Sequence, residues 1–161
     1  MCIRDRLKPL KKEPHSVIGS TSIGASIVGG VCNNSGGSLV KRGPAYTQLA
    51  LYAKVNAKGK LELINELDIN LGKTPEEILR NLEEKKYEKS DIINSNKLAS
   101  DDQYSKIIRE IDSSKPARFN ADPRLLYGVS GSAGKIAVFA VRLDTYPACL
   151  LYTSPSPRDR G

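Results

Sequence analysis

The stretch Gly19–Gly43 reads GSTSIGASIVGGVCNNSGGSLVKRG and decides how the rest of the chain is interpreted. Glycine, serine and asparagine surround a short run of apolar residues, which predicts a brief helix between glycine-rich turns. Glycines let a backbone approach a ligand closely, and a helix start presents free N–H groups, so the segment suits a pyrophosphate. On these residues alone, a set of turns and tight helix contacts is the more common explanation.

The stretch lacks the two familiar nucleotide-binding loops. A G-x-x-x-x-G-K-[ST] loop is excluded because Lys41 follows Leu39 and Val40 instead of a glycine. The G-x-G-x-x-G spacing is also absent between Gly19 and Gly37. Any dinucleotide bound here is therefore held by a different arrangement.

Three pieces of the stretch resemble the signature of FAD-binding domains of the vanillyl-alcohol-oxidase type, also called PCMH-type domains. That signature runs T-I-G-G, a short helix, N-A-G-G and a later Y-G or R-G. The chain has Ser22-Ile23-Gly24-Ala25, Asn34-Ser35-Gly36-Gly37 and Arg42-Gly43. Ala25 and Ser35 are departures from the pattern. The resemblance implies an α+β fold, namely a partial FAD-binding domain truncated at both ends.

Within that superfamily the chain is similar to the quinone-dependent D-lactate dehydrogenases over residues 7–147. The similarity is carried by the segments LKPL, EPHSVIGS, CNNSGGSLV, RGPAYT, PARFNADP and AGKIAVFAVRLDT. It implies a flavoprotein that oxidises D-lactate to pyruvate, transfers hydride to FAD and passes electrons to a quinone. It also implies peripheral association with the cytoplasmic face of the bacterial inner membrane, without a transmembrane segment. It implies no binding of nucleic acid.

The resemblance places FAD contacts on four residues, Gly19, Ser26, Gly36 and Val138. Glycine and serine amides can reach cofactor oxygens, and a main-chain contact at Val138 tolerates an apolar side chain. Taken by itself, Val138 is more simply a core residue. We expect no catalytic residue and no metal ligand in the chain, since the lone His15 has no catalytic partner at recognisable spacing.

The two ends of the chain look foreign to the rest. Residues 1–6 and 148–161 resemble the two reading directions of one adapter used in library preparation, which leaves 7–147 as the FAD-binding segment. Without the ends, Cys32 is the one remaining cysteine, so no disulfide framework is expected. Because the upstream flavin-phosphate loop and the downstream substrate portion are missing, we expect the chain alone to be inactive.

Two other functions compete with this interpretation. One is another FAD-dependent oxidoreductase of the same superfamily that acts on a different 2-hydroxy acid or alcohol. The other is a non-enzymatic basic binding module, suggested by the net charge of +7 over 161 residues. The lysines are scattered and no aromatic platform lies among them, which disfavours a nucleic-acid module.

The remaining sequence predicts short elements of both kinds. Alternating apolar residues predict an antiparallel hairpin from Tyr46–Asn56 and Leu61–Leu67. Thr74 to Glu77 forms a capping box that starts a helix at about Pro75–Lys86. Downstream we expect an exposed excursion over 85–102, a short helix near 103–111 and a strand over 135–143. At the start of the chain, residues 7–13 fit the tail of a helix.

Overall fold

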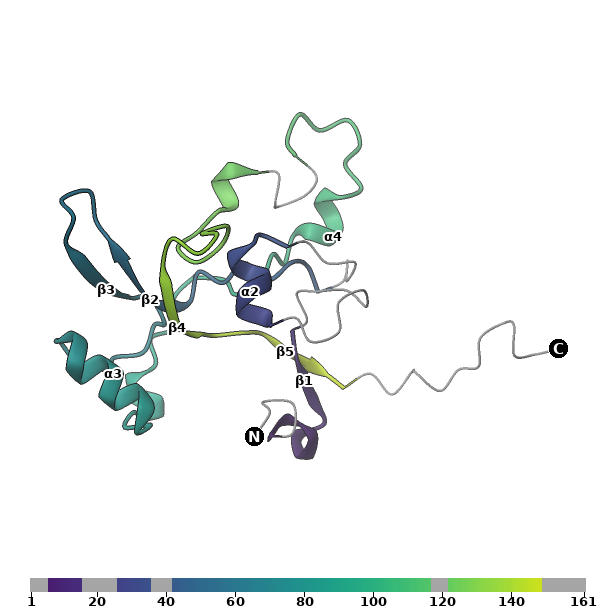
Figure 1. The fold of residues 1–161 in the computed structure, drawn as a ribbon. Coiled ribbons are helices and arrows are strands. Elements are labelled where there is room, and N and C mark those ends of the chain that lie inside the picture. Colours follow the sequence, from purple (N-terminus) through teal and green to yellow (C-terminus); the bar gives the residue numbers. More distant parts are fainter. Residues whose placement is uncertain (1–5, 16–25, 36–41, 117–121, 149–161) are drawn as a thin grey trace. The chain divides into compact units, whose positions relative to one another are not determined.

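The computed structural model describes residues 6–15, 26–35, 42–116, 122–148. The chain divides into two compact units (Figure 1). One is formed by residues 1–15 and 144–161, and the other by residues 16–143. Most of both adapter-like ends, and the predicted FAD contacts Gly19 and Gly36, lie outside the described residues.

The smaller unit pairs two short strands from distant parts of the sequence. β1 (Lys12–Pro14) runs antiparallel to β5 (Thr145–Pro147). The prediction of a helix tail over residues 7–13 is only partly right, because the 3-10 helix η1 (Lys8–Leu10) gives way to β1. His15 is buried beside this pair, and its ring lies edge-on to Tyr146 with the ring centroids 5.6 Å apart.

The larger unit contains a three-stranded antiparallel sheet in the order β3-β2-β4. β2 (Ala50–Val55) and β3 (Leu61–Asn65) form the predicted hairpin, although both strands are shorter than expected. β4 (Ala137–Val141) is the strand predicted over 135–143. Mixed helix and sheet, without a regular βαβ alternation among the described residues, agrees with the α+β class.

Helix α3 (Pro75–Glu83) covers one face of this sheet and begins at the predicted capping box. Thr74 Oγ1 accepts a hydrogen bond from the Glu77 N–H at 3.3 Å, and Glu77 Oε2 accepts one from the Lys73 N–H at 2.8 Å. The helix ends earlier than predicted, because Lys85 adopts a positive φ of 56°. Its apolar side packs on the sheet in a cluster of buried residues, namely Leu51, Leu67, Ile69, Leu71 and Ile78.

Helix α2 (Ile27–Cys32), the brief helix predicted in the glycine-rich stretch, packs on the opposite face (Figure 1). Side chains of neighbouring residues on a strand point to opposite faces, so Leu51 points toward α3 while Tyr52 points toward α2. The α2 cluster contains five buried residues, namely Val31, Ala45, Ala50, Tyr52 and Val129. Each helix therefore has its own core.

The excursion after α3 is largely exposed, as predicted, but its end is not. It contains the 3-10 helix η2 (Lys89–Asp91) and leads to α4 (Tyr104–Ile107), a shorter helix than predicted. Ala99, Ser100 and Asp101 are buried, and Ser100 forms a bridge with Ala45. A further 3-10 helix, η4 (Pro123–Leu125), precedes the loop that enters β4.

Candidate functional site

Ser26 caps the N-terminus of α2. Its backbone is extended (φ −81°, ψ 145°), and its side-chain oxygen accepts a hydrogen bond from the Gly29 N–H at 3.0 Å. A Cβ at Gly29 would lie 2.8 Å from Ser26 Oγ, so glycine there leaves room for the cap. Ser26 is exposed and its hydroxyl hydrogen is not used by this bond, so the side chain can still donate to a ligand.

The other end of α2 is tied to the loop that leads into β4. Gly131 donates its N–H to the Val31 carbonyl at 3.1 Å, and Ala133 donates to the Cys32 carbonyl at 2.9 Å. The loop can curl around the helix end because Gly131, Ala133 and Gly134 all have positive φ. These bonds satisfy carbonyls that a helix end leaves unpaired, and they fix α2 relative to β4.

Val138 lies on β4 directly opposite Tyr52 of β2. Its side chain is partly buried and packs against the α2 cluster, together with Ile27 from the first turn of α2. Ser26 and Val138, which are far apart in the sequence, therefore lie on two elements that share one core. The side chain of Val138 packs in that core, so a ligand contact at this position is expected through its main chain.

Tyr52 anchors this side of the sheet. Its hydroxyl donates to Glu66 Oε2 at 3.4 Å, and a Cβ at Gly128 would lie 3.0 Å from the Tyr52 ring. Burial raises the pKa of the Tyr52 phenol above its usual value, and the nearby Glu66 carboxylate raises it further. The phenol is therefore neutral at physiological pH and acts as a hydrogen-bond donor.

Three hydroxyl groups around this core are buried and have no hydrogen-bond partner in the described part of the chain. They belong to Thr47, Ser130 and Ser132. Thr47 also has a φ of 24°, an unusual conformation for a β-branched residue. A buried hydroxyl without a protein partner is completed by an ordered water or by a ligand, and strained backbones cluster at functional sites, so this region is a candidate ligand site.

Two of the four residues predicted to contact FAD lie in this region, and two other residues of the region were not predicted. Ser26 and Val138 lie on elements that pack together, whereas the positions of Gly19 and Gly36 are outside the described residues. Thr47 and Ser130 were not anticipated, because a single threonine or serine in a loop carries no sequence signal. Only the burial and the backbone angle reveal them.

Other candidate chemistry is not supported by the described residues. They contain no group of three His, Cys, Asp or Glu side chains that could hold a metal ion. Cys32 is a free, partly buried cysteine. Arg142 donates to the Leu67 carbonyl at 2.8 Å, which ties β4 to the segment after β3. No helix in the described segments is long and apolar enough to cross a membrane.

Comparison with known proteins identifies where this segment occurs. The chain is 60% identical over 145 residues to the quinone-dependent D-lactate dehydrogenase of Haemophilus influenzae, covering 90% of this chain and 26% of the relative. The Escherichia coli K12 enzyme of the same name is 56% identical over 142 residues, and that of Corynebacterium glutamicum is 48% identical over 145 residues. The chain is a homologue of one segment of these dehydrogenases.

The resemblance inferred from the sequence motifs is thereby confirmed. No protein-family model matches the chain. The chain spans about a quarter of the length of the quinone-dependent D-lactate dehydrogenases that it matches.

Proposed function

We propose that this chain is a segment of the flavin-binding region of a quinone-dependent D-lactate dehydrogenase. The observation that supports the proposal is the identity of 60% over 145 residues to a protein of that name. In this proposal the whole polypeptide oxidises D-lactate to pyruvate, and the electrons pass to a quinone. Association with the cytoplasmic face of the inner membrane belongs to the same proposal.

The residues around α2 and β4 fit FAD as the cofactor, in a PCMH-type domain. Ser26 presents an exposed hydroxyl, and Thr47 and Ser130 provide buried hydroxyls without a partner in the described chain. Uncharged donors of this kind suit the ribityl chain and the polar edge of a flavin ring. When bound, FAD would accept the hydride from the substrate. The residues that would contact FAD are Gly19, Ser26, Gly36 and Val138. Tyr52 would pack beside Val138 from the neighbouring strand.

The first test compares this chain with the full polypeptide. We expect a protein of the length of the relatives to purify with bound flavin and to reduce an artificial electron acceptor when D-lactate is added. We expect this chain alone, even with added FAD, to show no such activity, because it spans about a quarter of its relatives. Dye reduction followed by absorbance measures both.

The competing functions give different results in the same assay. If the full-length protein prefers another 2-hydroxy acid or an alcohol over D-lactate, the proposed substrate is wrong and the flavin assignment stands. If it contains no flavin and instead binds nucleic acid with a steep salt dependence, the basic-module alternative is correct. Activity of this chain alone with D-lactate would refute the expectation that it is incomplete.

A second test concerns Ser26 in the full-length protein. We expect Ser26→Ala to weaken FAD affinity about fivefold, because one hydrogen bond to a ligand contributes on the order of 1 kcal/mol. Ser26→Thr keeps the hydroxyl and also caps helices well, so it serves as the matched control. Affinity is measured by quenching of flavin fluorescence, and circular dichroism checks that α2 and its surroundings remain folded. Equal FAD affinity for both variants would remove Ser26 from the site.

A further inference from the structure

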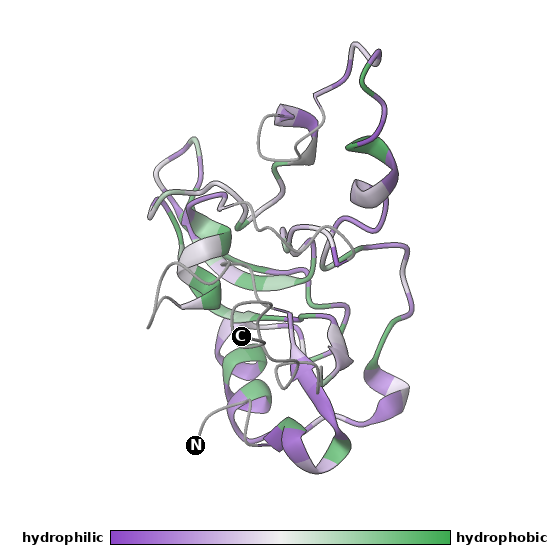
Figure 2. Cartoon of the chain, turned by 90° about the vertical axis from the view of Figure 1, so that its right-hand side faces the viewer, coloured by the Kyte–Doolittle hydropathy of each residue, from purple (hydrophilic) through white to green (hydrophobic). Residues whose placement is uncertain are grey.

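The exposed excursion after α3 is fixed by hydrogen bonds although few of its side chains are buried. All residues from Ile92 to Leu98 are exposed, and their sequence, IINSNKL, mixes apolar and polar residues (Figure 2). Burial of apolar surface therefore contributes little to the position of this stretch. We call residues 91–99 the strap, because each of its ends is bonded to another segment of the larger unit.

The first anchor of the strap is Asp68, in the turn after β3. The Ile93 N–H donates to the Asp68 carbonyl at 2.9 Å. The Asp68 carboxylate accepts hydrogen bonds from the Ser95 hydroxyl and from Lys97 Nζ, the latter at 3.1 Å. The Ser95 oxygen in turn accepts the Lys97 N–H at 3.1 Å. One residue of the turn thus holds three residues of the strap.

Asp68 is itself held in place by the core. The adjacent Leu67 is buried beneath α3, and its carbonyl accepts a hydrogen bond from Arg142 Nη1 at 2.8 Å. Partial burial opposes ionisation of Asp68, but the hydrogen bonds from Ser95 and Lys97 and the positive charges of Lys97 and Arg142 outweigh it. The pKa of Asp68 therefore lies below its usual value, and the carboxylate is charged at physiological pH.

The other end of the strap pairs with the segment before β2. The Gln48 N–H donates to the Leu98 carbonyl at 2.8 Å, and the Leu98 N–H donates to Gln48 Oε1 at 2.8 Å. Beside this pair, the N–H groups of Tyr46 and Thr47 both donate to the Ala99 carbonyl, at 3.0 and 2.8 Å. Two successive residues opposite a single one form a β-bulge, and bulges near functional sites redirect a side chain.

The bulge accounts for the unusual conformation of Thr47. Its φ is 24°, its side chain is 1% exposed, and its hydroxyl has no hydrogen-bond partner in the described part of the chain. Such a conformation persists only where the surrounding structure imposes it. Here the Ala99 carbonyl imposes it, and the position of that carbonyl depends on the strap.

We propose that Asp68 is a positioning residue for the flavin site, which fixes the strap through Ser95 and Lys97 so that the strap holds Thr47 where its hydroxyl reaches the cofactor. The inference rests on the proposed function, because it assigns to Thr47 the flavin as the partner that its hydroxyl lacks. Asp68 does not touch the cofactor. When the strap is released, Thr47 relaxes to an ordinary backbone conformation and the hydrogen bond to flavin is lost.

FAD affinity of the full-length protein, followed by quenching of flavin fluorescence, tests whether Asp68 acts through Thr47. We expect Thr47→Val to weaken FAD affinity about fivefold, as the loss of one hydrogen bond does. Asp68→Asn keeps a residue that tolerates the left-handed conformation and removes the charge. We expect it to weaken affinity at least twofold, but no more than Thr47→Val does. In the Thr47→Val background, Asp68→Asn should cause no further loss.

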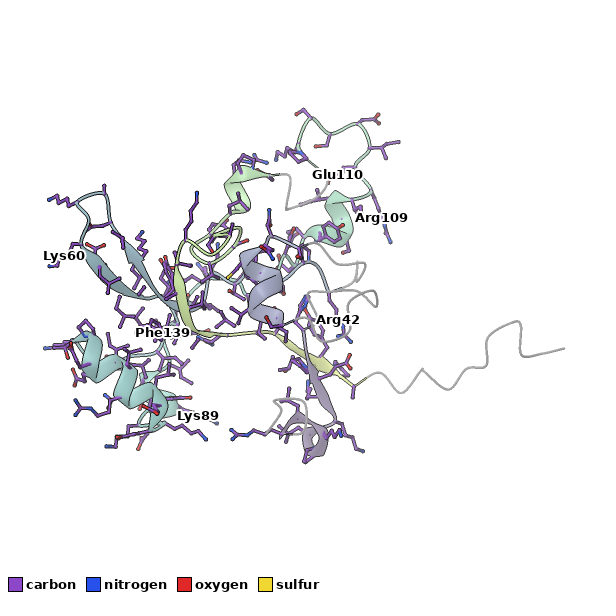
Figure 3. All side chains as sticks on the ribbon, in the orientation of Figure 1. Arg42, Lys60, Lys89, Arg109, Glu110 and Phe139 are labelled. Carbon is purple, nitrogen blue, oxygen red and sulfur yellow. The ribbon has the colours of Figure 1, made fainter. Side chains whose placement is uncertain are left out.

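Amide hydrogen exchange reports on the strap without reference to flavin. In the same protein without FAD, we expect Asp68→Asn to speed exchange of the Thr47 and Leu98 N–H groups about tenfold, because it weakens hydrogen bonds to a charged group. Lys97→Met should act in the same direction, and Lys97→Arg should restore the slow exchange. Lys89→Met is the matched control, because Lys89 is exposed in η2, ahead of the bonded part of the strap (Figure 3). It should leave exchange and affinity unchanged.

Three results would overturn the proposal. One is an FAD affinity of Thr47→Val equal to that of the unchanged protein, and another is an equal loss from Asp68→Asn with and without Thr47. The third is exchange of the Thr47 N–H that responds alike to Lys97→Met and Lys89→Met. A full-length protein without flavin would refute the proposed function and with it the role of Thr47, while faster exchange in Asp68→Asn would still show that Asp68 fixes the strap.

Discussion

Replacing Gly43 by alanine is expected to lower the free energy of unfolding of this chain by more than about 3 kcal/mol. Gly43 has a φ of 64°, a left-handed conformation that costs an L residue about 1–2 kcal/mol. A Cβ built on Gly43 would also lie 1.8 Å from the carbonyl oxygen of Asp101 and 2.9 Å from its carbonyl carbon. Neither distance is possible without movement of the backbone.

That backbone is held in place from several sides. Asp101 donates its N–H to the Pro44 carbonyl at 2.9 Å, and the adjacent Ala45 and Ser100 form a bridge. The carboxylate of Asp101 accepts a hydrogen bond from the Gln103 N–H at 2.9 Å. Moving Asp101 away from a new methyl group would break bonds on both sides of it, which is why the expected cost exceeds that of the backbone angle alone.

Gly59→Ala is the matched control for this substitution. Gly59 has a φ of 75°, and apart from its chain neighbours no described residue has an atom within 4 Å of the position of its Cβ. Alanine there should cost only the left-handed conformation, about 1–2 kcal/mol. Urea unfolding followed by circular dichroism compares the two variants. If Gly43→Ala is no more destabilised than Gly59→Ala, the close approach of Asp101 is not a constraint in solution.

This geometry shows what the sequence could and could not reveal. Arg42-Gly43 was recognised as part of a flavin-binding signature, but the structure gives Gly43 a structural reason to be glycine. The residue responsible, Asp101, lies far along the chain in a segment that we predicted to be an exposed excursion leading into a helix. Contacts between distant segments leave no periodic pattern, so this one could not be predicted.

The elements that local patterns define were predicted well. Alternation of apolar residues gave the β2–β3 hairpin, and Thr74 with Glu77 marked the start of α3. The pairing of β1 with β5 was not predicted, since each strand has only three residues and its partner is at the other end of the chain. In the candidate site, Ser26 and Val138 came from family resemblance, and only the folded core shows that their elements pack together.

The second large effect is expected at Leu51, whose side chain has 0% exposure in the cluster beneath α3. Leu51→Ala should lower the free energy of unfolding by about 2–5 kcal/mol, because it removes buried methyl groups and leaves a cavity. Leu51 is flanked by Asn65 on β3 and Ala140 on β4, and α3 closes the face above it. The side chains of Asn65 and Ala140 cannot fill the cavity left by the truncated leucine. The loss of unfolding free energy should therefore fall in the upper half of that range.

Leu61→Ala makes the same chemical change on the same hairpin and serves as the control. Leu61 is 68% exposed, so its truncation should change the free energy of unfolding by no more than about 0.5 kcal/mol. Chemical denaturation of the two variants side by side tests whether the cluster beneath α3 is a true core when the chain is alone. Similar small losses for both would mean that α3 does not pack on the sheet when this chain is alone.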